Sequence, residues 1–537
     1  MSGDLAPGIN NSYILIRWIF VRFISLIYFL AFLSFLLEAP GLYGSQGILP
    51  VADFVSANFN SGGTTALSNL LDFPSVFLFF NDDQALLAIP LLAMFLATIA
   101  MAGIMPGFCL LVLWSLYLSI VNAGQDFMSF QWDILLLEVG FLSIFFASWK
   151  PLDLLPGLAA NSKPWVTEVL KRFEKLGLME NGQPSIAVIW LFRWLAFRLL
   201  FASGLVKVGD RTWDSLTAMS YHYETQPLPT PLGWLAHHLP GWFQSLSTVG
   251  ALGVELMVPF MFFGPRSWRW IACLIQLGLQ LLIMATGNFC FFNWLTIALC
   301  LLLLDDKHLY RIWTFLRNKI KRLECFEYSL IDGESDRNRK PSKLRLFVLV
   351  PLISIISLLS VHNFILLNPL SFYIPGPMMG MVNRAYSYHL VNSYGLFARM
   401  TTERPEIVVE GSRDGKEWLA YEFKYKPGRL DRMPPLIAPL QPRLDWQMWF
   451  AALGSLDHNP WFLKFSYRLL TDSHPVEGLL AKNPFSQGGP PRFLRARVYM
   501  YKMTSIEELF KSGRWWRREF TQEYMPAISL KVGDQKK

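Results

Sequence analysis

Long apolar runs separated by short polar segments occupy the first two thirds of this 537-residue chain. A helix needs about 20 mainly apolar residues to cross a bilayer. Runs near this length predict about nine membrane-spanning helices, at residues 14–37, 85–104, 107–122, 133–149, 186–206, 246–263, 270–286, 289–304 and 344–362. The apolar segment 73–80 is too short to span, so we expect it at the membrane interface. The pattern predicts a polytopic α-helical membrane bundle within residues 1–375.

After about residue 375 the pattern becomes that of a globular domain. Residues 406–425 predict two strands joined at Asp414-Gly415, a dipeptide that suits the positive φ values of tight hairpin turns. Residues 495–503 alternate polar and apolar side chains and predict another strand. Apolar residues have helical spacing at 444–453 and 461–470. Residues 376–537 are therefore expected to form an α+β domain that contains an antiparallel sheet.

Lys and Arg are distributed unevenly among the loops between the predicted spans. They are absent from 38–88, 122–133 and 285–290, whereas 150–185 holds five, 264–269 two and 305–345 eleven. Since Lys and Arg gather on the cytoplasmic side, nine spans with a cytoplasmic N-terminus place every basic loop inside. The exception is the external segment 207–244, which carries Lys207 and Arg211. The C-terminal domain is then extracytoplasmic. We expect the protein in the ER membrane if it is eukaryotic and in the inner or plasma membrane if it is bacterial.

The composition agrees with a lipid environment. The chain is 53% hydrophobic and 16% charged, whereas soluble globular proteins carry about 25% charged residues. Its net charge of +8 is explained by the basic loops, so we expect membrane lipid and no nucleic acid as a partner. The five cysteines form no CxxC or metal-ligand spacing, which favours roles in packing. We expect no metal and no cofactor.

Ionisable residues within apolar runs are functional candidates by default, because burying a charge in a membrane is costly. This chain has five such candidates: Asp133, Glu138, Arg193, Arg198 and Glu255. One interpretation is that Arg–Glu or Arg–Asp pairs tie helices together. The alternatives are a catalytic or transport role, or contact with a substrate.

A polar segment precedes a Pro-rich stretch in the external loop 220–240. Its His222 and Glu224, with Lys207 at the end of a span, are the candidate catalytic residues if the protein is an enzyme. The alternative is a polar loop wedged on the helical bundle. The chain has no GxSxG, HExxH, P-loop or Gly-rich dinucleotide motif, so no standard catalytic signature supports the enzymatic interpretation.

The segment 442–454 combines aromatic and polar residues near the start of one predicted helix. Exposed Trp and Arg are typical of interface anchors. The candidates for binding a client protein are Arg443, Asp445, Trp446, Gln447 and Trp449. We expect at least one of the two Trp side chains to be exposed near the loop 220–240. The alternative is that both Trp are core residues and that Asp445 is the N-cap or a first-turn acid of the helix.

These segments resemble the lipase maturation factor family. The resemblance lies in FQWDILLLEVGF and in further segments collinear over most of the chain, at residues 130–141, 192–240, 286–306, 391–428, 441–454 and 483–485. It implies a membrane protein that helps secreted lipases reach their folded, active and assembled state. It also implies work in the ER membrane in animals, with the C-terminal domain needed for activity.

Three functions compete on these grounds. The leading one is a non-enzymatic maturation factor whose external face holds an incompletely folded lipase or other exported client. The second is a membrane enzyme with a layout similar to that of the vitamin K-dependent carboxylases. The third is a transporter, which is expected to show paired internal repeats, and no convincing repeat is found.

Overall fold

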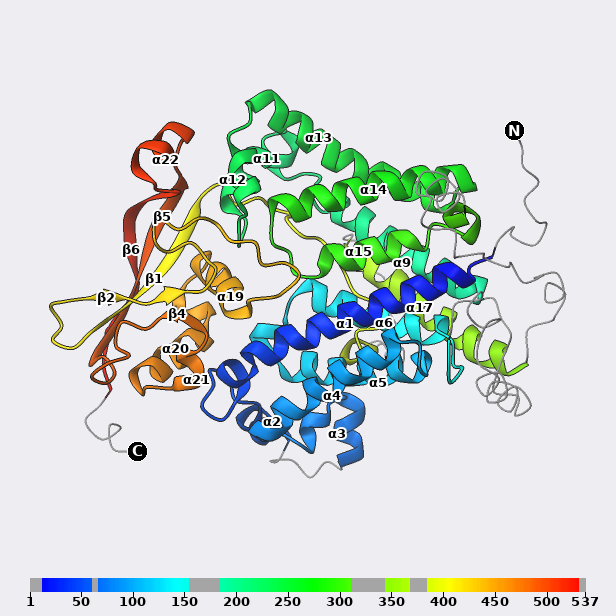
Figure 1. Ribbon diagram of the computed structural model, residues 1–537, viewed down its shortest axis with the longest axis horizontal. Coiled ribbons are helices and arrows are strands. Elements are labelled where there is room, and N and C mark those ends of the chain that lie inside the picture. Colours follow the sequence, from blue (N-terminus) through cyan, green and yellow to red (C-terminus); the bar gives the residue numbers. More distant parts are fainter. Residues whose placement is uncertain (1–11, 60–65, 154–183, 311–342, 368–383, 531–537) are drawn as a thin grey trace, which may run out of the picture.

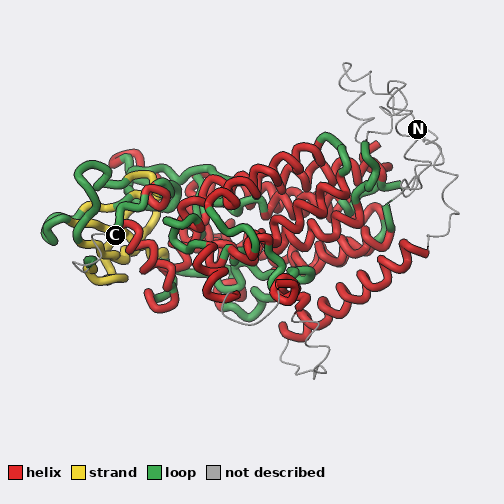
Figure 2. Tube along the Cα trace, turned by 90° about the horizontal axis from the view of Figure 1, so that it is seen from below, coloured by secondary structure: helices red, strands yellow, loops and turns green. Residues whose placement is uncertain are grey.

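The computed structural model describes residues 12–59, 66–153, 184–310, 343–367 and 384–530. Figure 1 shows the helices along most of the longest axis and the sheet at one end. Figure 2 shows the same separation of strands and helices after a quarter turn. The predicted domain boundary at residues 375/376 lies outside the described residues.

Each predicted apolar run coincides with a helix of the structure. These helices are α1 (Ile14–Tyr43), α4 (Asp83–Met101), α5 (Pro106–Ala123), α6 (Gln131–Phe146), α9 (Ile186–Leu205), α13 (Gly241–Met257) with η4 (Val258–Phe263), α14 (Arg266–Thr286), α15 (Phe292–Leu301) and α17 (Lys343–Leu367). Within the described residues, six are long and apolar enough to cross a membrane, namely α1, α4, α5, α9, α13 with η4, and α14. The count of nine spans stays a prediction.

Shorter helices connect the long ones, and local capping explains several of their ends. They are α2 (Val51–Phe59), α3 (Ala66–Asp72), η2 (Val76–Leu78), η3 (Gln125–Met128), α10 (Arg211–Asp214), α11 (Ala218–Thr225) and α12 (Pro231–His237). The Asp82 side chain caps α4 by accepting from the Ala85 N–H, and Thr230 caps α12 in the same way with Gly233. Pro106 and Pro231 occupy the first turns of α5 and α12, where the N–H that proline lacks would have no partner within the helix.

The sheet has the order β2-β1-β5-β6 and is antiparallel throughout. Its strands are β1 (Arg404–Ser412), β2 (Leu419–Ala420), β5 (Phe493–Met503) and β6 (Trp516–Ile528), and β3 (Glu422–Phe423) pairs separately with β4 (Leu480–Lys482). The predicted hairpin is confirmed, because β1 and β2 flank Gly415 with its φ of 76°. The predicted strand at 495–503 is confirmed as β5.

Both predicted helices of the C-terminal domain are confirmed, as α19 (Arg443–Ala452) and α20 (Pro460–Leu470). The remaining helices there are η6 (Leu456–His458), α21 (His474–Glu477) and α22 (Ile506–Ser512). Figure 1 shows α19 between the sheet and the long helices, and α19 packs against β1. One apolar core therefore continues from the helices into this domain, where the Phe127 and Trp461 rings lie 5.3 Å apart.

The segments free of Lys and Arg lie against the C-terminal domain. Arg468 on α20 donates to the carbonyl oxygen of Gly47 at 2.8 Å, in the connection after α1. Asn288, between α14 and α15, donates to the Pro435 carbonyl at 2.9 Å. The start of α1 lies at the other end of the bundle, where the Ile14 N–H donates to Asp306 and Arg22 pairs with Asp153 at 2.7 Å.

Candidate functional site

The first residue of α19, Arg443, joins the C-terminal domain to the bundle through a fully buried ion pair with Asp133 of α6. Its two Nη atoms donate to the Asp133 carboxylate at 2.8 and 2.9 Å, and both side chains have 0% exposure. Nη1 also donates to the Phe127 carbonyl at 2.8 Å, and the Tyr117 hydroxyl donates to Asp133. A bidentate geometry fixes the orientation of the guanidinium as well as its position.

Three more candidate residues of α19, Trp446, Gln447 and Trp449, also contact the bundle. The Trp446 and Trp132 rings lie 4.7 Å apart. The Trp449 indole N–H donates to the Thr225 carbonyl at 2.9 Å, and the Gln447 amide donates to the Asp126 carbonyl. Trp446 is 3% exposed and Trp449 is 7% exposed.

The expectation that at least one Trp is exposed for a client is therefore wrong. The physical reason is that α19 is covered on one side by β1 and on the other by the bundle, so both of its Trp side chains are buried. In this arrangement most of the side chains proposed to bind a client instead hold the C-terminal domain to the membrane part. These side chains are Arg443, Trp446, Gln447 and Trp449, whereas Asp445 contacts the C-terminal domain itself.

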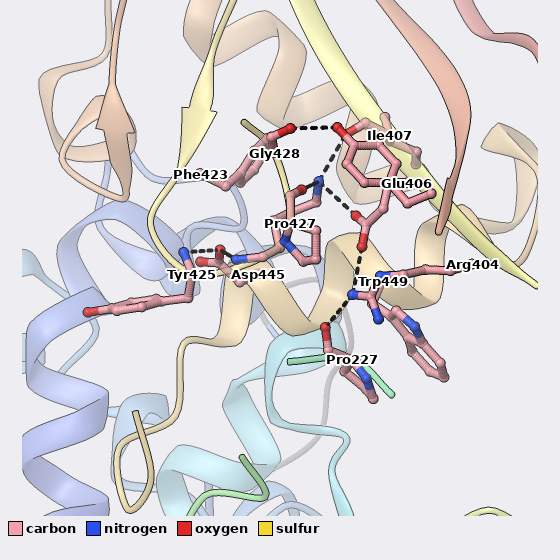
Figure 3. A network of polar contacts seen from close by, with 12 residues as sticks. Pro227, Arg404, Glu406, Ile407, Phe423, Tyr425, Pro427, Gly428, Asp445 and Trp449 are labelled. Atoms are coloured by element: carbon pink, nitrogen blue, oxygen red, sulfur yellow. Dashed lines mark hydrogen bonds and ion pairs between the residues drawn. The ribbon is translucent and has the colours of Figure 1, made fainter. Parts of the chain in front are cut away.

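Asp445 lies in the first turn of α19, as predicted, but it does not cap the helix, because Pro442 occupies the N-cap position. Its carboxylate accepts from the backbone N–H groups of Tyr425 and Lys426 at 2.8 and 2.7 Å, as Figure 3 shows. Burial raises the pKa of Asp445, and these hydrogen bonds oppose that rise. The side chain thus fastens the segment after β3 to α19.

A second buried network centres on Glu406 of β1 (Figure 3). Its two carboxylate oxygens each pair with one cation at 2.8 Å, Arg404 on one side and Lys426 on the other. Arg404 also donates to the carbonyl oxygens of Pro227 at 2.8 Å and Glu224 at 2.7 Å. Burial lowers the pKa of Arg404, and Glu406 opposes this shift. The network ties β1 to the connection between α11 and α12.

The polar residues inside the bundle form pairs as well. Arg198 of α9 pairs with Glu138 of α6, which confirms that an Arg–Glu pair ties helices together. Glu138 also accepts from the Tyr394 hydroxyl at 2.8 Å and from the Asn392 N–H at 3.1 Å. Arg193 donates to the Tyr13 hydroxyl at 3.1 Å. Among the described residues, Glu255 of α13 pairs with Lys207, which follows α9, and not with an arginine.

The three candidate catalytic residues do not converge on one point. Lys207 and His222 line a common cavity of about 640 Å³, whereas the Glu224 carboxylate accepts from the Met503 N–H at 2.7 Å, at the end of β5. Burial, with a further contribution from Lys207, lowers the pKa of His222 to about 4. The described part of the chain contains no group of three His, Cys, Asp or Glu residues placed to hold a metal ion.

Comparison with known protein families shows which family the chain belongs to. The model of the lipase maturation factor transmembrane domain matches residues 15–311, and that of the lipase maturation factor C-terminal domain matches residues 390–526. The chain belongs to the lipase maturation factor family. With its apolar helices, this membership makes it an integral membrane protein.

Relatives in this family match over nearly the whole chain. Lipase maturation factor 2 of Homo sapiens is 35% identical over 96% of this chain and 82% of its own length. Lipase maturation factor 2 of Gallus gallus is 36% identical with the same coverage. Lipase maturation factor 1 of Homo sapiens is 33% identical over 98% of this chain and 90% of its own length. No solved structure matches the chain.

In this lipase maturation factor family member, sequence reasoning missed the residues that complete the connection between the two family domains. Arg404 and Glu406 are two positions apart, so they lie on the same face of β1, next to apolar residues. Charged residues on one face of such a strand are the signal that predicts a buried pair. Asn392 and Tyr394 gave no comparable signal, because their acidic partner, Glu138, lies 254 and 256 positions away along the chain.

Proposed function

We propose that this protein is a membrane-bound maturation factor that assists the folding or assembly of secreted lipases or other exported proteins. One observation carries the proposal: the transmembrane and C-terminal domains of the family both match, in order, and the relatives with matching length are named lipase maturation factors. His222 lines the cavity and the Glu224 carboxylate binds the Met503 N–H instead, and this separation does not favour the enzymatic alternative.

The C-terminal domain is proposed to lie on the extracytoplasmic side, where an exported client folds. The segments free of Lys and Arg contact this domain, whereas the basic turn at the start of α14 lies at the opposite end, with Arg266 paired to Asp305 at 2.6 Å. This supports an orientation with the N-terminus in the cytoplasm. A tag at residue 335 is then protected from external protease and a tag at residue 537 is cleaved; tags with equal accessibility would refute the orientation.

The client is proposed to contact α22 of the C-terminal domain rather than α19. Helix α22 presents Ile506 and Phe510, which are 46% and 85% exposed and one helical turn apart. On β6, an edge strand of the sheet, Phe520 is 50% exposed. Exposed apolar side chains of this kind can contact apolar client surface that has not yet been buried. The buried connections described above hold this surface at a fixed position relative to the membrane.

The test is capture of a reporter lipase by the full-length protein in cells, followed by crosslinking and co-purification. The double variant Ile506→Ser with Phe510→Ser is expected to capture less lipase at an unchanged protein level, because neither side chain is buried. Lys511→Ser on the same helix is the matched control, since its ammonium group forms only an exposed pair with Glu507. No lipase captured by the unaltered protein would contradict the proposed function, whereas unchanged capture by the double variant would contradict only the location of the contact.

A further inference from the structure

The cavity of about 640 Å³ lies within the membrane part, between α9, α13, α14 and α15 and beside α11. Most of its lining is apolar, with Leu200, Val254, Leu279 and Phe292 as examples. This volume and lining are typical of sites for small apolar ligands, which are about 300–1,000 Å³ with a few polar groups.

Two glycines keep the cavity open. Gly250 of α13 and Gly278 of α14 both line it, and a Cβ added at either position would meet no atom within 4 Å. Small residues in membrane helices commonly allow two helices to approach closely. At these two positions they border empty space instead, so the lack of side chains creates volume rather than a helix contact.

The cavity is continuous with the outer surface of α14. Its lining residues Leu274, Ile275 and Leu282 are 47%, 38% and 66% exposed. Both α13 with η4 and α14 are long and apolar enough to cross a membrane, so this outer surface faces lipid chains. An apolar ligand can therefore enter sideways from the bilayer without crossing water.

Beside α11, the lining of the cavity includes the charged residues Lys207 and Glu255 and the imidazole of His222. The Lys207 ammonium group pairs with Glu255 and lies 4.9 Å from the centre of the Trp213 ring. The Nδ1 atom of His222 has no hydrogen-bond partner within the described residues. The paired charges cancel, and the lowered pKa of His222 keeps its imidazole neutral near pH 7. This part of the lining can bind a hydrogen-bonding group but offers no net charge to an ionic one.

We infer that this cavity binds one acyl lipid from the surrounding bilayer, with its chain between α13 and α14 and an uncharged hydroxyl or ester group at His222 and the Lys207–Glu255 pair. The ring of Phe397, which also lines the cavity, lies 4.8 Å from the His222 ring. Phe397 precedes β1, and its carbonyl accepts from the Trp213 indole at 3.0 Å. The bound lipid thus contacts the segment that leads into the C-terminal domain.

The test uses the full-length protein in nanodiscs and two photoreactive probes, a diacylglycerol and a phosphatidylcholine that carry the same diazirine-labelled acyl chain. Labelled residues are located by mass spectrometry. Gly250→Leu and Gly278→Leu each place a side chain in the cavity. Gly253→Leu is the matched control, because Gly253 lies on α13 in equally open space but does not line the cavity. Thermal unfolding of all variants shows whether each is folded.

The diacylglycerol probe is expected to label residues that line the cavity. Labelling should be about tenfold weaker in Gly250→Leu and Gly278→Leu, equivalent to about 1.4 kcal/mol of binding free energy, and unchanged in Gly253→Leu. Labelling that is equal in all folded variants, or absent from the cavity of the unaltered protein, would overturn the site. Equal or stronger labelling of the cavity by phosphatidylcholine would overturn the uncharged polar group.

Discussion

The connection between Arg443 and Asp133 gives the sharpest test of how the C-terminal domain is held. Arg443→Met leaves the Asp133 carboxylate buried without its two guanidinium hydrogen bonds, and among the described residues only the Tyr117 hydroxyl still donates to it. Because both side chains have 0% exposure, solvent cannot replace the lost partner. Breaking a buried pair from one side costs about 3–5 kcal/mol. Asp133→Leu is expected to cost a similar amount, because it leaves Arg443 unpaired.

The double variant Arg443→Met with Asp133→Leu separates a true pair from two independent contributions. Removing both charges leaves no buried ion, so its loss of stability is expected to be no larger than that of either single variant. Independent residues would instead add their losses, to about 6–10 kcal/mol. Arg429→Met is the matched control: its pair with Asp431 is 58% and 53% exposed, so we expect less than about 1 kcal/mol.

The assay is thermal unfolding of the purified full-length protein in detergent, followed by tryptophan fluorescence at one fixed heating rate. Trp446 and Trp132 lie close to the pair and report on this interface. The expected order of midpoints is control first, then the double variant at or above the two single variants. Additive losses in the double variant, or single variants as stable as the control, would refute the reasoning.

Three further outcomes follow from buried groups. Trp446→Ala is expected to destabilise the protein by about 3–5 kcal/mol and to lower protein level and secreted lipase activity in parallel; lost activity at a normal level would contradict a core role. Arg198→Leu leaves Glu138 unpaired and should lower the unfolding midpoint, and a midpoint equal to that of the unaltered protein would show that the pair contributes nothing. The pKa of His222 falls from its ordinary 6.5 to about 4 in the folded protein. The contribution of its neutral imidazole to the free energy of unfolding is therefore fully present above pH 6.5. It is lost as the pH falls toward 4, by up to about 3 kcal/mol, and a His222→Phe variant should lose less stability over that interval in thermal unfolding at pH 7.5 and 4.5.

The hydrophobic pattern located the long helices, and the alternation of side chains located β5, because both signals are local. The Asp414-Gly415 turn could also be predicted from the sequence, since this dipeptide itself favours the positive φ found at Gly415. The role of α19 in joining the two domains could not be predicted from the sequence. Trp446 and Arg443 look the same along the chain whether they face water or a partner helix. Their partners, Trp132 and Asp133, lie about 310 positions away, and only the folded chain brings them together.

The sequence predicts that the intramembrane charges form ion pairs, but it only partly predicts which residues pair with each other. The cost of a buried charge requires a counter-ion, so the sequence predicts an acidic partner for Arg198 but does not specify Glu138. Whether Glu255 pairs with Arg198 or with Lys207 depends on how the helices pack. The residues around Glu255 in the sequence do not indicate that packing.

The central claim, that the protein matures secreted lipases, is tested most directly by the specific activity of a lipase secreted from cells. The host lacks its own maturation factors and expresses the lipase alone, with this protein, or with the Arg443→Met variant. Lipase protein and lipase activity are measured separately in the medium. The account predicts that activity per secreted lipase molecule rises when this protein is present and falls back with Arg443→Met, which loosens the C-terminal domain. Equal specific activity with and without the protein would contradict the claim.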